Sequence, residues 1–165
     1  MSDRNTYIER LETARTEMRK IVKVAQGNPT IYQPWRMKEV LDHITGWDDA
    51  VIASIRSLLA GEVPATPAAR GRGIDFYNKE TVSSREAIPY EVTQREWEAS
   101  RAELLGLIHE MREEQLHAHF VMPWGSQGTI ETLVEIFTEH EETHAKEIRD
   151  IIEKEQLTSK NESPS

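Results

Sequence analysis

Two histidines in the C-terminal third of the chain, His140 and His144, have the residue type and spacing to bind one metal ion. Residues four positions apart lie about one turn apart on the same face of an α-helix, so both imidazoles can reach a common point. They also interrupt an apolar series at positions where aliphatic side chains would be expected; the series comprises Ile130, Leu133, Val134, Phe137, Ile148, Ile151 and Ile152. An unpartnered buried polar group costs about 1–3 kcal/mol, and a shared metal ion would satisfy both rings.

Two alternative interpretations of this segment compete with a non-proteolytic metal site, and only the first of them involves no metal. In the simpler one, the two histidines form hydrogen bonds with core hydroxyls, carboxylates or water. In the other, the string H-E-E-T-H at 140–144 matches the H-E-x-x-H motif of zinc proteases, and Glu141 would be the general base. The clefts of such proteases need an edge strand, and the sequence predicts none. The protease is therefore the less favoured alternative, with Glu141 as its catalytic candidate.

A third ligand is offered by His43, which lies at the margin of an earlier apolar stripe, one helical turn before Trp47. Taken alone, a histidine in this place is more typical of a helix flank than of a metal site. The chain contains no cysteine, so any metal must be bound through nitrogen and oxygen. Imidazole suits zinc, nickel, iron and manganese, and the sequence does not choose among these ions. The remaining histidines, His109, His117 and His119, are not expected to be ligands.

Four long segments with helical periodicity position these residues, at 5–25, 35–60, 90–111 and 129–155. Gly, Pro and Asn clusters separate them, and a shorter helix is expected at 74–81. An apolar fraction of 38% suffices for a bundle, because each helix buries only one stripe. The predicted fold is all-α: an antiparallel four-helix bundle with a long connection between its second and third helices. One domain is expected at 1–155, followed by a disordered tail at 156–165.

Composition narrows the expected partners and location. The chain carries 29 acidic and 20 basic residues, a formal charge of −9, so neither nucleic acid nor an anionic membrane surface is an expected partner. No apolar run approaches the roughly 20 residues needed to span a bilayer, and no secretory signal is evident. Together with the absence of cysteine, this predicts a cytoplasmic protein. An exposed apolar helix face is common in such bundles, so a homodimer is expected.

Several segments resemble the DinB-like superfamily of bacterial four-helix-bundle proteins, to which metal-dependent activity is attributed. The stretch W-x-M-K-E-V-L-D-H-I-T-G-W-D at 35–48 is similar to the second-helix signature of that family, and T-E-H-E-E-T-H-A-K-E-I at 138–148 to its C-terminal H-x-x-x-H. The middle segments W-E-A-S-R-A-E-L-L-G-L-I and W-G-S-Q-G-T-I also resemble the ClbS/DfsB-like branch. The resemblance implies that His43, His140 and His144 bind the metal ion, with coordination positions left for water or substrate.

The resemblance also implies a function, since relatives in this group include transferases and isomerases that depend on low-molecular-weight thiols. It favours a thiol-dependent S-transferase that acts on an electrophilic or toxic small molecule bound under the long connection. Trp124 and Tyr77 are the expected substrate contacts. A metal-water hydrolase of reactive compounds is the first alternative. A stress protein that binds a metal or ligand without turnover is the second.

Overall fold

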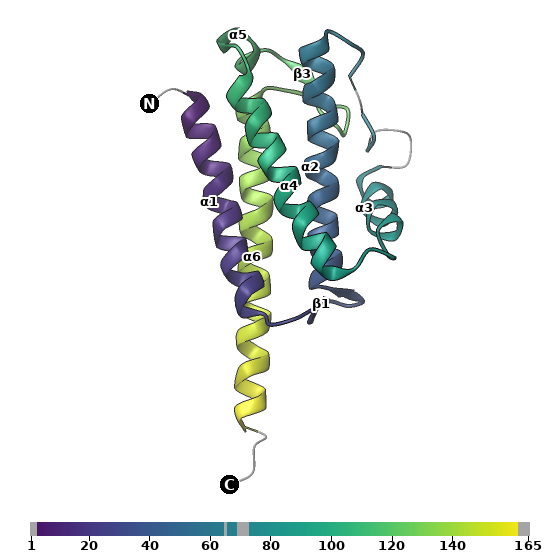
Figure 1. Ribbon diagram of the computed structural model, residues 1–165, viewed down its shortest axis with the longest axis vertical. Helices are drawn as coiled ribbons and strands as arrows, with labels where there is room; N and C mark the ends of the chain where they lie inside the picture. The colour runs from purple at the N-terminus through teal and green to yellow at the C-terminus, as the bar shows by residue number, and fades with distance from the viewer. Residues whose placement is uncertain (1–2, 65, 69–72, 162–165) are drawn as a thin grey trace.

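Four long helices form the body of the protein in the computed structural model, which describes residues 3–64, 66–68 and 73–161. They are α1 (Asp3–Val24), α2 (Met37–Ala60), α4 (Tyr90–Glu110) and α6 (Ile130–Asn161), and they lie side by side in Figure 1. Most contacts between helices are made by α2 with α4 and by α1 with α6. The predicted helical bundle is confirmed. No helix among the described residues is both long and apolar enough to cross a membrane.

The long connection between the second and third long helices is also present, and it sets the direction of the chain. It contains α3 (Gly73–Ser84) and carries the chain back along the bundle before α4 begins. As a result α2 and α4 run in the same direction, while α1 and α6 run in the opposite direction (Figure 1). The two pairs are therefore antiparallel to each other. In this arrangement α2 faces α6, and these two helices carry the candidate ligands.

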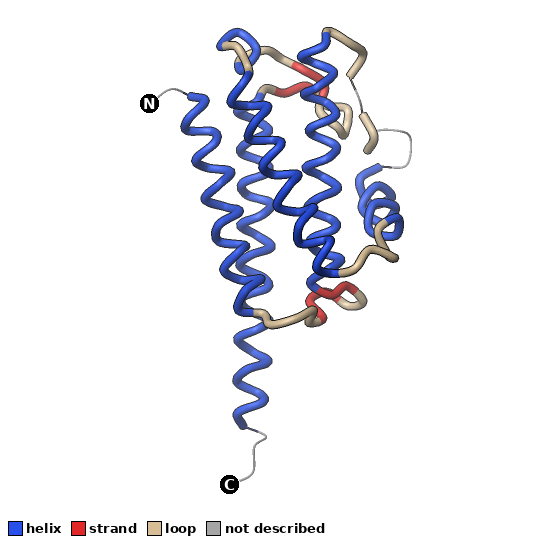
Figure 2. The backbone as a smooth tube through the Cα atoms, in the orientation of Figure 1, coloured by secondary structure: helices blue, strands red, loops and turns tan. Residues whose placement is uncertain are grey.

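Two short hairpins lie at opposite ends of the bundle and were not expected from the sequence (Figure 2). One pairs β1 (Thr30–Tyr32) with β2 (Trp35–Arg36), and the other pairs β3 (Phe120–Val121) with β4 (Gln127–Gly128). Strands of two or three residues are too short to produce the alternation by which strands are recognised. A single helical turn, α5 (Glu113–Leu116), joins α4 to the second hairpin.

The last helix is longer than the sequence predicts. A disordered tail is expected from residue 156, but α6 continues to Asn161, and residues 162–165 lie outside the described part of the chain. The hydroxyls of Thr158 and Ser159 donate to the carbonyls of Lys154 and Glu155, one turn earlier, so these polar residues remain compatible with the helix. Residues 153–159 are exposed, so this end of α6 lacks the burial that periodicity detects.

The short helix α3 packs closely across α2 at a glycine. A Cβ atom placed on Gly46 would lie 2.0 Å from Cγ2 of Thr81, a separation that real side chains do not adopt. The hydroxyl of Tyr77 donates to the carbonyl oxygen of Gly46 at 2.7 Å, and the indole N–H of Trp47 donates to Asn78 at 2.9 Å. Gly46 therefore permits the close approach by which α3 covers this part of α2.

We predict that Gly46→Ala destabilises the protein by about 1–3 kcal/mol, because the new methyl group must displace α3. Equilibrium unfolding in denaturant measures this change. Gly106→Ala is the matched control, because open space surrounds that helical glycine and alanine there should be neutral or slightly stabilising. Equal stability of the two variants would show that the contact between Gly46 and Thr81 does not hold α3 in place.

Candidate metal centre

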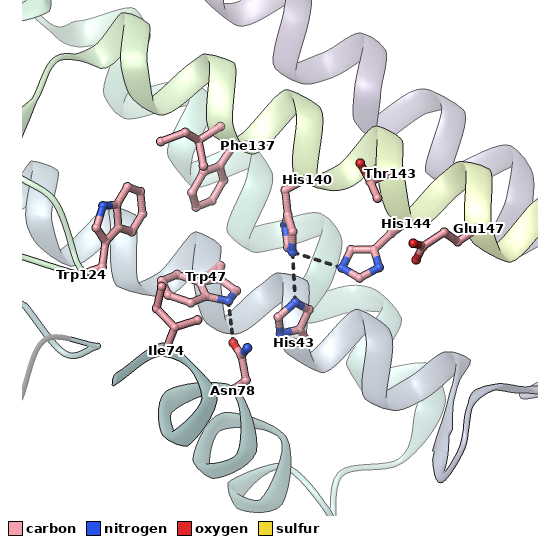
Figure 3. A pocket seen from close by; sticks show the side chains of 11 residues that line it. His43, Trp47, Ile74, Asn78, Trp124, Phe137, His140, Thr143, His144 and Glu147 are labelled. Carbon is pink, nitrogen blue, oxygen red and sulfur yellow. Dashed lines mark hydrogen bonds between the residues drawn. The ribbon is translucent and has the colours of Figure 1, made fainter. Parts of the chain in front are cut away.

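The three histidines singled out by the sequence come together between α2 and α6 (Figure 3). Nε2 of His140 lies 3.0 Å from Nε2 of His43 and 3.1 Å from Nε2 of His144. One ligand atom from each ring lies within 4.8 Å of the other two. The four-residue step on α6 aligns His140 with His144, and His43 reaches them from α2. Two helices thus direct three ring nitrogens at one point.

Hydrogen bonds alone cannot serve all of these ring nitrogens well. A neutral imidazole has one N–H and one bare nitrogen, and a nitrogen that carries a proton cannot accept another. Nε2 of His140 is common to both short contacts, so a single proton there cannot serve both neighbours at full strength. The buried Nδ1 of His43 also has no hydrogen-bond partner among the described residues. A cation at the centre would accept all three lone pairs.

The distances also suit a metal ion. Imidazole nitrogens bind first-row metals at about 2.0–2.1 Å, so two of them on one ion are separated by about 3.0–3.4 Å. The separations of 3.0 and 3.1 Å fall at the lower end of this interval. Burial lowers the pKa of His43 to about 3 and that of His140 to about 4, and it also lowers the pKa of His144. All three rings are therefore neutral at pH 7, the form that binds a metal.

Without metal, the same burial makes the fold sensitive to acid. The ordinary pKa of histidine, near 6.5, applies to the unfolded chain, which therefore takes up protons below that pH while folded His43 and His140 do not. Stability is fully present above pH 6.5 and is lost as the pH falls towards 4. We predict a loss on the order of 4 kcal/mol between pH 7.5 and 5, about half of it from each of these two rings, measured by denaturant unfolding with a chelator present. A His140→Ala variant with the same slope would contradict this origin.

A largely apolar pocket of about 520 Å³ opens beside the three histidines and includes their side chains in its wall. The rest of the wall is formed by Trp47, Ile74, Asn78, Trp124, Ile136, Phe137, Thr143 and Glu147 (Figure 3). Such a cavity, with a few polar groups at one end, is typical of a small-molecule site. The ring nitrogens therefore face a space that a ligand can enter.

The two expected substrate contacts have different positions. Trp124 lines the pocket. Tyr77 does not; its ring packs against Trp47 with 4.9 Å between centroids, and its hydroxyl is bound to the backbone of α2. Tyr77 thus supports the wall from behind. Trp47 itself lines the pocket: its N–H is bound by Asn78 of α3, and its ring makes a T-shaped contact with Trp124, with 6.0 Å between centroids.

Glu141 does not face the histidines. Its Oε1 accepts from Nε of Arg15 at 2.5 Å, and its Oε2 lies 2.8 Å from Nη1 of Arg101. Adjacent helical residues point about 100° apart, so a residue next to His140 faces a different part of the core. The protease interpretation, with Glu141 as general base, is therefore wrong. The carboxylate is occupied by two guanidinium groups.

Glu141 belongs to a layer of four buried charged side chains, one from each long helix. We call it the buried ion layer; its members are Arg15, Asp48, Arg101 and Glu141, each at most 1% exposed. Asp48 accepts from Arg15 at 2.9 Å and from Arg101 at 3.0 Å. The layer separates two apolar core clusters; on α1, for example, it falls between Leu11 and Met18. Two positive and two negative charges balance, so each compensates the burial of the others.

The solved structures that are similar to this chain include the following two. The colibactin self-resistance protein ClbS, solved in complex with double-stranded DNA, has a TM-score of 0.73 and 12% sequence identity over 91% of this chain and 95% of that one. The mycothiol-dependent maleylpyruvate isomerase has a TM-score of 0.67 and 14% identity over 90% of this chain. The match spans 63% of the isomerase. At these identities the similarity establishes the fold. Comparison with curated proteins gives no match at the level of sequence.

The ClbS structure corrects one expectation. Nucleic acid is excluded above on the basis of a formal charge of −9, but a protein of this fold is known in complex with a DNA duplex. Net charge describes the whole molecule, whereas DNA contacts one face, so the exclusion is wrong. The family model of the DinB superfamily matches residues 9–148, which include all three converging histidines. This chain belongs to the DinB superfamily.

Proposed function

We propose that His43, His140 and His144 hold one divalent metal ion, and that the protein uses it to transfer a low-molecular-weight thiol to an electrophilic small molecule. The observation that carries the proposal is the convergence of three neutral imidazole nitrogens on one point in the wall of an apolar pocket. Three protein ligands leave positions open for exchangeable groups, as in catalytic metal sites. Similarity of fold to a mycothiol-dependent isomerase supports thiol as the co-substrate.

A bound divalent ion would lower the pKa of a thiol and so favour the thiolate at neutral pH. In the reaction, the thiol loses its proton to solvent and its sulfur forms a bond to the electrophilic carbon. The leaving group departs with its bonding electrons or, for addition to an activated double bond, the adjacent carbon takes up a proton. The chain has no cysteine, so the co-substrate must supply the sulfur.

The pocket indicates the kind of electrophile. Trp47, Trp124 and Phe137 present aromatic surface to the cavity, and its few other polar side chains lie near the histidines or on α3. An uncharged, largely apolar molecule with an aromatic or conjugated part would bury its surface here at little cost in desolvation. Its reactive carbon would then lie at the end of the pocket that the histidines form.

The proposal is tested by turnover with purified, metal-loaded protein. Mycothiol, glutathione and free cysteine would each be combined with 1-chloro-2,4-dinitrobenzene and with monobromobimane, and formation of the thioether followed by absorbance or fluorescence. We expect a rate above that of the metal-free protein with at least one thiol, and loss of this rate in His144→Ala. A rate that is equal with and without metal across all these pairs would refute the proposal.

Hydrolysis by metal-activated water is the alternative, because the open positions of a three-histidine ion can also hold water, and similarity to ClbS, a self-resistance protein, agrees with action on a reactive compound. It differs from thiol transfer in one respect, because it needs no added thiol. Consumption of a reactive substrate by metal-loaded protein without thiol would therefore favour the hydrolase. The same similarity makes duplex DNA a ligand to test, by fluorescence anisotropy with a labelled duplex at low salt, where a weak electrostatic contact is strongest.

A further inference from the structure

The hydroxyl of Tyr32, which no part of the proposed function uses, bridges one of the three histidines to a carboxylate. Tyr32 ends strand β1 in the hairpin that precedes α2, and its side chain is half-buried. Its Oη lies 2.9 Å from Nδ1 of His144 and 2.5 Å from Oε2 of Glu147. Glu147 follows His144 by three residues on α6, so both lie on the face that Tyr32 contacts. The three groups form one hydrogen-bonded chain.

The number of protons shared by these three groups determines which nitrogen of the His144 ring is protonated. A phenol has a single proton, and a carboxylate can only accept. The hydroxyl of Tyr32 must therefore donate to Glu147. Its contact with His144 can be a hydrogen bond only if the proton is on Nδ1 of the ring and Oη accepts it. In the neutral ring this leaves Nε2 bare, the atom that faces His140 at 3.1 Å.

We propose that Tyr32 and Glu147 are positioning residues that hold His144 in its Nδ1-protonated form, with the Nε2 lone pair directed at the metal. The inference rests on the proposed metal site and adds residues that do not touch the ion. Outer partners of this kind fix ring orientation and raise the basicity of the ligand, and their loss typically costs about 10–100-fold in metal affinity. The hairpin β1–β2 then contributes to the metal site, because it places Tyr32 beside His144.

The three histidines differ in what holds each ring in its orientation. Nδ1 of His43 is buried without a hydrogen-bond partner in the described part of the chain, so that ring is held by packing, including contact with Trp35 at 5.5 Å between centroids. His144 is less buried than His43 and has more freedom to rotate without an anchor. The hydrogen-bonded chain is therefore placed where orientation by packing is weaker.

The first experiment compares zinc affinity by competition with a chromogenic chelator. We expect Tyr32→Phe to weaken binding about 10–100-fold. Glu147→Gln should weaken it less, because the amide oxygen can still accept from the phenol. Tyr90→Phe is the matched control: its hydroxyl is buried without a partner among the described residues, and its removal should leave affinity unchanged. If Tyr32→Phe binds zinc as tightly as Tyr90→Phe does, the inference is overturned.

The second experiment needs no metal and separates this inference from the metal site. Long-range ¹H–¹⁵N correlation spectra of the metal-free protein report which ring nitrogen of each histidine carries the proton. We expect His144 to be protonated on Nδ1 in the wild-type protein and in Tyr90→Phe, and to populate the Nε2-protonated form in Tyr32→Phe. A His144 ring protonated on Nε2 in the wild-type protein would overturn the inference even if zinc binds. If His144 is protonated on Nδ1 as expected but the protein does not bind zinc, the proposed function is wrong instead.

Discussion

Replacing Glu141 with alanine is expected to destabilise the protein by about 3–5 kcal/mol, a large part of the stability of a typical domain. The substitution leaves Arg15 and Arg101 with one carboxylate between two buried guanidinium groups, since only Asp48 remains. An uncompensated charge at a site with no exposure cannot be relieved by water. Denaturant unfolding followed by circular dichroism measures the loss.

Glu142→Ala is the control for this prediction, because Glu142 is the next residue on α6 and is exposed. We expect its stability to remain within about 0.5 kcal/mol of the wild-type value. Should Glu141→Ala fail to accumulate as folded protein while Glu142→Ala does so normally, the result would agree with the prediction. Equal stability of the two variants would show that the buried ion layer does not support the fold.

Replacing His140 with alanine is expected to lower zinc affinity by at least about 100-fold. Even groups outside the coordination shell contribute about 10–100-fold, and His140 is the ring that contacts both other histidines. The effect should be confined to binding. In the metal-free protein the substitution removes a crowded nitrogen and its desolvation cost, so stability should change little or rise. Calorimetric titration with zinc and unfolding with a chelator give the two quantities.

His109→Ala provides the comparison, since His109 is exposed near the end of α4 and is not one of the three converging histidines. Its zinc affinity should equal that of the wild-type protein. If both substitutions reduced affinity to the same extent, zinc would be binding to scattered surface histidines. If neither did so, the site would lie elsewhere.

The sequence was most informative where polar residues interrupt a regular apolar pattern. On α6, histidines replace aliphatic residues at the correct period, and this signal predicted both the face of the helix and the pair His140 and His144. The position of His43 could not be derived from its own surroundings, because a single histidine beside an apolar stripe has many explanations. Family resemblance supplied the pairing of the two helices, and the coordinates bring all three rings together.

The buried ion layer could not be anticipated, for a physical reason. Arg15 and Asp48 each occupy a stripe position, and a charged residue there ordinarily indicates the edge of a buried face. Only the packing of all four long helices reveals that each charge has partners at the same level. The error over Glu141 has this origin: a short motif specified a role, while contacts distant in sequence determined where the side chain points.

The contact of Tyr32 with His144 was not predicted, because it depends on a hairpin that the sequence does not indicate. The segment between α1 and α2 contains turn-forming residues, and such segments are usually described as loops. Strands of two or three residues nevertheless fix the direction of this tyrosine towards α6. Glu147 is one of 29 acidic residues in the chain, and no sequence signal separates it from the others.

The central claim is that three ring nitrogens from α2 and α6 hold one metal ion, and metal analysis tests it most directly. The protein would be loaded with zinc, freed of excess metal by gel filtration and examined by mass spectrometry and X-ray absorption at the zinc edge. We predict one zinc per chain with about three imidazole ligands near 2.0–2.1 Å, and no retained zinc in His144→Ala. Zinc retained equally by both proteins, or by neither, would contradict it.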